Sequence, residues 1–147
     1  MLEKHAALIQ ELFACTSTLL EAGIVRSDKI LGDIGEWLCV QKYGLVLESS
    51  GRHPGYDGKI GKSRVQVKVH NSPAGTNLSV GNPEQYDELI VIVGPRSRLR
   101  VSEVDATFHV YRFPSAEVKR LMKRNSGHYF AKGILKNSKP DAIQLKT

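Results

Sequence analysis

The sequence of 147 residues contains little cysteine and no long apolar segment. Its two cysteines, Cys15 and Cys39, lie in helical patterns and are expected to be buried and reduced, as in a cytoplasmic protein. No apolar run reaches the roughly 18 residues that a membrane span needs, and the N-terminus lacks the basic and apolar segments of a signal peptide. The five histidines show no zinc spacing, and we interpret His70 as a surface residue rather than a substrate contact. These absences predict a cytoplasmic protein with no membrane partner.

Acidic residues are scarce toward the C-terminus. Of the net charge of +6, residues 112–147 contribute +7, with nine Lys or Arg and only Glu117 and Asp141 as acids, so the rest of the chain sums to −1. A concentrated basic segment suits a polyanionic partner, because binding releases counterions from phosphates. A solvated basic face without a partner is the alternative. The cations expected to contact nucleic acid lie in a predicted helix and in a basic turn (Lys119, Arg120, Lys123, Arg124, Arg96, Arg98 and Arg100).

A first helix is predicted over residues 2–22. Its apolar residues recur with the helical period and would place one stripe on the core (Leu8, Leu12, Cys15 and Leu19). We expect this helix to be a packing element without chemistry of its own.

A second helix is predicted from Ser27, its N-cap, to about Tyr43, with Gly44 as its stop. Glu36 interrupts an apolar part of this helix. Its carboxylate points either to solvent beside Asp33 or into a polar pocket, and the pattern leaves both orientations open.

A hairpin is the clearest local pattern in the chain. Valine alternates with polar residues over 64–70, which predicts a strand with one face in the core. Residues 56–60 can pair with it antiparallel across a two-residue turn. The numbers of opposite residues then sum to 123, which sets Asp57 across from Gln66, with Lys68 on the same face.

The remaining segments complete a mixed α/β pattern. The apolar run 89–93 predicts a strand buried on both faces, and 107–113 predicts another. Residues 71–83 are rich in Gly, Pro, Asn and Ser and are expected to form a functional loop. Ser115 is expected to cap a helix that faces inward with Val118, Leu121 and Met122. The segment 127–147 is weakly patterned.

Glu36 on an early helix, Asp57 on one strand and Gln66-x-Lys68 on the next resemble the motif of the PD-(D/E)XK nuclease superfamily. The resemblance covers about residues 32–93. It implies a restriction-endonuclease-like αβββαβ core of α/β (α+β) class with a mixed central sheet, here with an extra N-terminal helix and a basic C-terminal helical segment. Two positions depart from the family pattern: Tyr56 replaces its proline, and Gln66 replaces a carboxylate.

Carried over residue by residue, the resemblance makes Asp57 the metal ligand, Gln66 the variable acidic position, Lys68 the catalytic lysine and Glu36 the helix carboxylate. The chemistry agrees with these roles, since a phosphodiester is protected by its negative charge. Mg²⁺, or Mn²⁺ in its place, supplies charge neutralisation and an activated water. The side-chain oxygen of Gln66 and the carbonyl of Val67 would complete the ligands, and Lys68 would orient the attacking water.

We expect a single domain over residues 1–147, with a core at about 27–113 between the N-terminal helix and the basic part 114–147. The predicted function is a metal-dependent nuclease acting on double-stranded DNA in restriction, defence or repair. A non-catalytic nucleic-acid-binding module and a structural subunit of a larger defence or processing assembly are the alternatives. Intact Asp57 and Lys68 favour the first. A homodimer is left open.

Overall fold

The computed structural model describes residues 2–21, 30–49, 54–101 and 104–145. Its helices are α1 (Leu2–Glu21), α2 (Leu31–Tyr43), α3 (Ser115–Leu121) and the 3₁₀ helix η1 (Lys132–Asn137). Its strands are β1 (Val46–Leu47), β2 (Gly58–Ile60), β3 (Ser63–His70), β4 (Leu78–Ser79), β5 (Glu88–Val93), β6 (Phe108–Pro114), β7 (Lys123–Arg124), β8 (Gly127–Phe130) and β9 (Asp141–Ile143). Among the described helices, none is long and apolar enough to span a membrane.

The main sheet is mixed, as predicted, with six strands in the order β1-β2-β3-β5-β6-β9. β3 and β5 run parallel, and the other neighbouring pairs are antiparallel. A small sheet, β4-β8-β7, lies beside it. The apolar run in β5 is central because its side chains are buried on both faces, which confirms the prediction for this strand.

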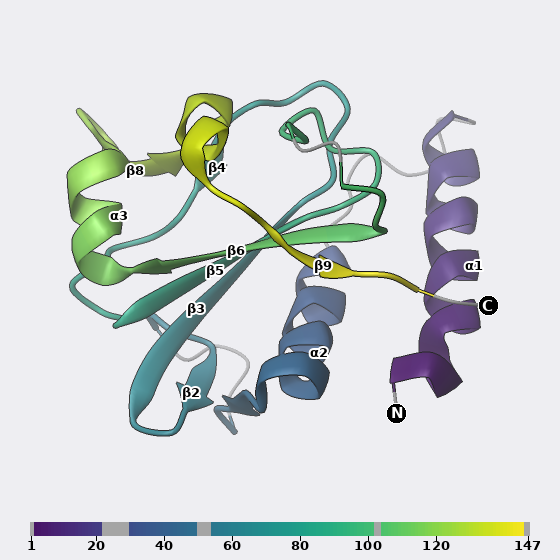
Figure 1. Ribbon diagram of the computed structural model, residues 1–147, viewed down its shortest axis with the longest axis horizontal. Coiled ribbons are helices and arrows are strands. Elements are labelled where there is room, and N and C mark those ends of the chain that lie inside the picture. The colour runs from purple at the N-terminus through teal and green to yellow at the C-terminus, as the bar shows by residue number, and fades with distance from the viewer. Residues whose placement is uncertain (1, 22–29, 50–53, 102–103, 146–147) are drawn as a thin grey trace.

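Two apolar cores lie on opposite faces of the main sheet (Figure 1). On one face, Ile90 and Ile92 of β5 pack in the core that includes residues of α1 and α2. On the other, Leu89, Val91 and Val93 pack in the core that includes residues of α3, β8 and η1. Successive strand residues therefore serve different layers, as the period of two requires.

The β2–β3 hairpin has the predicted register. Gly58 pairs with Val65 and Ile60 with Ser63, so that opposite numbers sum to 123. The pairing begins at Gly58 rather than at Tyr56, and β2 covers only the first three residues of β3. Beyond Val65, the edge of β3 on the β2 side has no described strand beside it, which leaves backbone and side chains there for a site.

Gly35 brings α2 close to this open edge. A Cβ atom built at Gly35 would lie 2.2 Å from Cγ2 of Val69, so only glycine permits this approach. The next residue, Glu36, is thereby carried to β3. The helix ends as predicted at Gly44, which adopts the left-handed conformation (φ 69°). Ser27, the predicted N-cap, lies outside the described residues, and the described helix begins at Leu31.

The buried stripe of α1 differs from the predicted one. Leu8 is 64% exposed and Cys15 is exposed, so the prediction that both face the core is wrong. Leu12 is half-buried, and the side chain of Leu19 lies outside the described ones. The residues that face the core are a second set with helical spacing (Ala6, Ile9, Phe13 and Thr16). Packing selects this set, since the ring of Phe13 lies 5.4 Å from that of Phe108 on β6.

The C-terminal part is less helical than predicted. Ser115 is the first residue of α3 rather than its cap, and Leu121 is 41% exposed rather than buried. Lys123 and Arg124 form the short strand β7. The weakly patterned segment after residue 126 contains β8, η1 and β9, and β9 closes one edge of the main sheet. Strands of two to four residues are too short to show a period.

The connection between the parallel strands β3 and β5 also differs from expectation. An αβββαβ order places a helix after the third strand. Residues 71–87, all of them described, contain the short strand β4 and no helix. The prediction of a plain loop over 71–83 is thus wrong at Leu78–Ser79, which pair with β8. The turn-forming composition of this segment explains why no helix forms there.

Candidate active site

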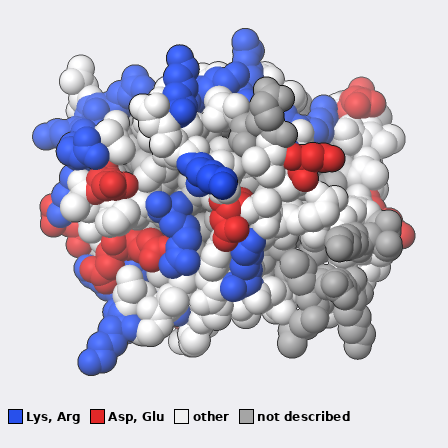
Figure 2. Space-filling model, viewed as in Figure 1, with Lys and Arg blue, Asp and Glu red and all other residues white. Residues whose placement is uncertain are grey.

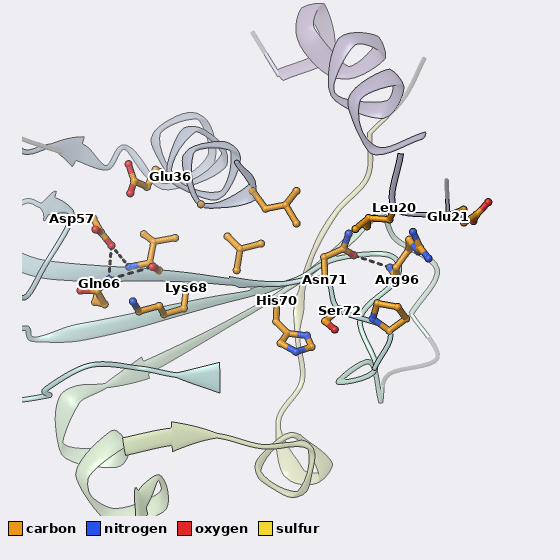
Figure 3. A pocket seen from close by; sticks show the side chains of 15 residues that line it. Leu20, Glu21, Glu36, Asp57, Gln66, Lys68, His70, Asn71, Ser72 and Arg96 are labelled. Carbon is orange, nitrogen blue, oxygen red and sulfur yellow. Dashed lines mark hydrogen bonds between the residues drawn. The ribbon is translucent and has the colours of Figure 1, made fainter. Parts of the chain in front are cut away.

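A pocket of about 740 Å³ lies along the open edge of β3 (Figure 3). Its walls come from the end of α1, the start of α2, β3 and the turn after β5. One end, which we call the acidic end, is lined by Glu36, Asp57, Gln66, Val67 and Lys68. The other, which we call the arginine end, is lined by His70, Asn71, Ser72 and Arg96. The structure thus brings the five residues predicted for catalysis and metal binding into one pocket.

The Asp57 side chain accepts a hydrogen bond from β3 beyond the last residue of β3 that pairs with β2. Its own N–H donates to the carbonyl of Val65 at 2.9 Å. Its carboxylate Oδ2 then accepts the backbone N–H of Val67 at 2.7 Å and Nε2 of Gln66 at 2.7 Å. Asp57 therefore satisfies part of the open strand edge and lies in contact with Gln66, as the register implies.

The two carboxylates of the acidic end are held in surroundings that disfavour their charge. Burial raises the pKa of Asp57, against the lowering effects of the Val67 N–H and the nearby Lys68 charge. Burial also raises the pKa of Glu36, and the charges of Asp57 and Asp33 raise it further. No described residue forms a hydrogen bond or an ion pair with the Glu36 carboxylate. Of the two orientations left open for Glu36, the structure has the one that lines the pocket.

Gln66 is only 8% exposed and is held by its amide nitrogen. Besides the bond to Asp57, Nε2 lies 3.3 Å from the carbonyl oxygen of Val67. Both partners are acceptors, which fixes the orientation of the amide. Gln66 thus satisfies two hydrogen-bond acceptors of the acidic end.

Lys68 is half-buried on β3, and Figure 3 shows its side chain beside Gln66. No ion pair joins it to an acidic residue in the described part of the chain, yet its charge lowers the pKa of Asp57. The ammonium is therefore near the acidic end and available to an anion.

The donor set of the acidic end fits a hard divalent cation. It offers two carboxylates, the Val67 carbonyl and the amide of Gln66, all of which are oxygen ligands of the kind Mg²⁺ and Mn²⁺ prefer. Mg²⁺ keeps several waters and needs only one or two carboxylates. Among the described residues, no three or more His, Cys, Asp or Glu side chains are grouped so that they could hold a metal ion.

The arginine end includes a buried histidine. His70 is only 6% exposed, so its interpretation as a surface residue is wrong. Its Nδ1 lies 2.6 Å from the hydroxyl of Ser97, and burial lowers its pKa. The turn after β5 covers the end of β3, and Arg98 N–H donates to the Ser72 carbonyl at 2.9 Å. The sequence gives no local signal for this contact.

The three arginines of the predicted basic turn have different surroundings. Arg98 is exposed, and Arg96 lines the pocket. Arg100 is occupied within the protein: its guanidinium donates to the carbonyls of Thr107 (3.1 Å) and Ala106 (2.7 Å). Arg100 therefore holds the chain before β6 and is unsuited to the phosphate contact that we predicted for it.

The predicted surface cations are all exposed (Lys119, Arg120, Lys123 and Arg124). Figure 2 shows Lys and Arg gathered along the top and upper left of the molecule, where Figure 1 places η1, β8 and α3. Lys119 forms an ion pair with Glu84 at 2.8 Å. We call the four exposed cations Lys119, Arg120, Lys123 and Arg124 the basic surface.

A comparison of the chain with models of known protein families and with curated proteins finds no match.

Proposed function

We propose that the protein is a metal-dependent nuclease of the PD-(D/E)XK type that hydrolyses phosphodiester bonds of double-stranded DNA. The observation that carries this proposal is the acidic end of the pocket, where Asp57 and Glu36 lie together with Lys68. Burial, and then the charges of Asp57 and Asp33, raise the pKa of Glu36, and a bound cation would offset these effects. The carboxylates are therefore arranged for a ligand of positive charge, and the ammonium for one of negative charge.

The fold supports the same proposal. α2 precedes a hairpin whose second strand is parallel to β5, which agrees with the core of a restriction-endonuclease-like domain. The crossover over residues 71–87 would be a variant without its helix. The glutamine at position 66 would be a second departure.

Asp57 and Glu36 would hold Mg²⁺ or Mn²⁺, with the Val67 carbonyl as a neutral ligand. The ion would neutralise the phosphate and lower the pKa of a bound water. Gln66 now directs Nε2 toward Asp57, so its amide must turn for its oxygen to serve as a ligand. Lys68 would orient the attacking water and stabilise the charge that develops on the phosphate oxygens.

The basic surface would hold the nucleic-acid backbone without reading its sequence. Exposed Lys and Arg contribute through counterion release, which is strong in sum and independent of base identity. Binding and chemistry would then depend on different residues.

The test is a cleavage assay on supercoiled plasmid, linear DNA and RNA, with Mg²⁺, with Mn²⁺ and with EDTA. We expect metal-dependent cleavage of DNA by the wild type and none by Asp57→Asn. Asp87→Asn is the matched control, because Asp87 forms an exposed ion pair with Arg64 outside the pocket. This variant should cleave DNA as the wild type does. Wild-type protein that cuts none of these substrates with either metal would overturn the proposal.

One observation favours a second candidate, a non-catalytic nucleic-acid-binding module. The Gln66 amide donates to Asp57 Oδ2, so hydrogen-bond donors already satisfy part of the acidic end. Such a module would bind DNA equally with metal and with EDTA. It would also bind less tightly after Gln66→Glu, because the new charge would repel phosphate.

A further inference from the structure

We propose that the arginine end of the pocket is a second phosphate-binding subsite, in which Arg96 holds a phosphate of the strand whose scissile bond lies at the acidic end. The inference rests on the proposed function for the identity of the ligand. It assigns one particular phosphate of the bound strand to Arg96, whereas the basic surface would contact the backbone at no fixed phosphate.

The backbone of Arg96 is held firmly at the end of β3. Gly94 N–H donates to the carbonyl of His70 at 2.8 Å, which extends the parallel pairing of β3 and β5 past the strand ends. Arg96 N–H donates to Oδ1 of Asn71 at 2.8 Å, and Asn71 is itself only 6% exposed. This side of the pocket is thus a built structure rather than a free loop.

The guanidinium of Arg96 is also positioned, but it is not neutralised. Its Nη1 donates to the hydroxyl of Ser17 on α1 at 2.6 Å. No ion pair joins Arg96 to a described acidic residue, and Figure 3 shows the Glu21 carboxylate pointing away from it. A planar guanidinium with further N–H donors matches the oxygens of a phosphate in geometry and charge.

The spacing suits two phosphates of one strand. At about 3.3 Å of rise per strand residue, Val67 and Asn71 lie about 13 Å apart along β3. Because the phosphates wind about the helix axis, adjacent phosphates of one strand lie about twice the ~3.4 Å axial rise apart, so this separation corresponds to about two nucleotides. The carboxylates repel phosphate unless a cation is bound, whereas Arg96 attracts it directly. The pocket would therefore bind the strand first at the arginine end.

The experiment measures the affinity of wild-type protein in EDTA, by fluorescence anisotropy, for a labelled DNA duplex no longer than the stretch the protein covers, so that the duplex binds in one register. Single phosphates of the duplex are replaced in turn by uncharged methylphosphonates. We expect one substitution, about two nucleotides from the scissile phosphate, to weaken wild-type binding about tenfold or more, as for a lost charged hydrogen bond. Arg96→Gln should bind the unmodified duplex as weakly as the wild type binds that substituted duplex. A methylphosphonate at that one position should not weaken the binding of Arg96→Gln further.

Three variants isolate the effect. Arg98→Gln removes the same charge from the same turn, and its affinity should change about equally at all positions. Ser17→Ala removes the bond from α1 and keeps the positional effect, while Arg96→Lys keeps the charge and should be intermediate. Thermal melting shows whether each variant is folded. The inference is overturned if folded Arg96→Gln or Arg96→Lys keeps the full positional effect, or if wild type shows none. If the wild type cuts no DNA but one methylphosphonate position still weakens its binding, only the nuclease proposal is overturned.

Discussion

The pocket and the basic surface use positive charge in different ways. In the pocket, Lys68 and Arg96 are half-buried, and each is placed by the strand or turn that carries it. On the basic surface, Arg120 and Lys123 are exposed side chains. A charge fixed beside half-buried carboxylates acts at one point, whereas exposed charges act together and are screened by salt.

Because of this difference, substitutions in the two regions should impair different steps. Changes at the acidic end of the pocket should alter chemistry or metal binding with little effect on the affinity for long DNA. Changes on the basic surface should alter affinity and its salt dependence while the chemical step remains. The following predictions test this separation.

Lys68→Ala should have the largest effect. Loss of one group that stabilises developing charge lowers the rate about 10²- to 10³-fold, and we expect this in single-turnover cleavage. Mg²⁺ binding by calorimetry should persist, because an ammonium repels the ion. Lys59→Ala on the neighbouring strand is the control, since Lys59 is exposed outside the pocket. Full activity of Lys68→Ala would contradict its assigned role.

Reversing the charge of all four residues of the basic surface should weaken DNA binding by more than about tenfold at low salt. The slope of log K against log salt should fall by about 0.9 for each lost phosphate contact. Lys119 should contribute least, because it already pairs with Glu84. Binding is measured by titration over a range of salt. A selective loss of the chemical step at saturating DNA would show that the two regions are not separate.

Gln66→Glu should raise Mg²⁺ affinity about tenfold, the lower end of typical effects of metal-site partners. It adds a carboxylate beside Asp57, so the metal-free protein should melt at a lower temperature. Cleavage should survive or improve. Calorimetric titration with and without metal measures these effects, and unchanged Mg²⁺ affinity would argue that residue 66 is not a ligand.

The smallest expected effect is on the metal-free protein, where Glu36→Gln should raise the melting temperature. The pKa of Glu36 is raised in the folded state, so the folded state binds its proton more tightly than the unfolded state does. The stability from that proton is therefore present at low pH and lost as pH rises through the folded pKa. The melting difference between variant and wild type should be largest near neutral pH and vanish in acid. Glu11→Gln, an exposed residue of α1 outside the pocket, is the matched control.

The hairpin could be predicted because its information is local. Eight residues of alternating pattern and a tight turn determine its register, and the register places Asp57 against Gln66. The stripe of α1 could not be predicted in the same way, because this helix has apolar residues on more than one side. There the partner, Phe108, decides which side is buried.

The arginine end of the pocket depends on contacts that no local pattern contains. Asn71 and Arg96 are 25 residues apart, and they meet only because β3 and β5 pair in parallel. The burial of His70 under Ser97 has the same origin. The surroundings of Arg100 could not be predicted for a related reason: its charge is visible in the sequence, but the backbone carbonyls that accept its hydrogen bonds are not.

The bond from the Val67 N–H to the Asp57 carboxylate gives the protein an intrinsic spectroscopic reporter. An amide proton bound to a carboxylate oxygen changes its magnetic environment when that oxygen gains a proton or shares its charge with a cation. The Val67 amide signal should therefore follow the state of Asp57 during titrations with acid or metal, without any added label. Its rate of hydrogen exchange should follow the same events, because a side chain rather than a neighbouring strand protects this position.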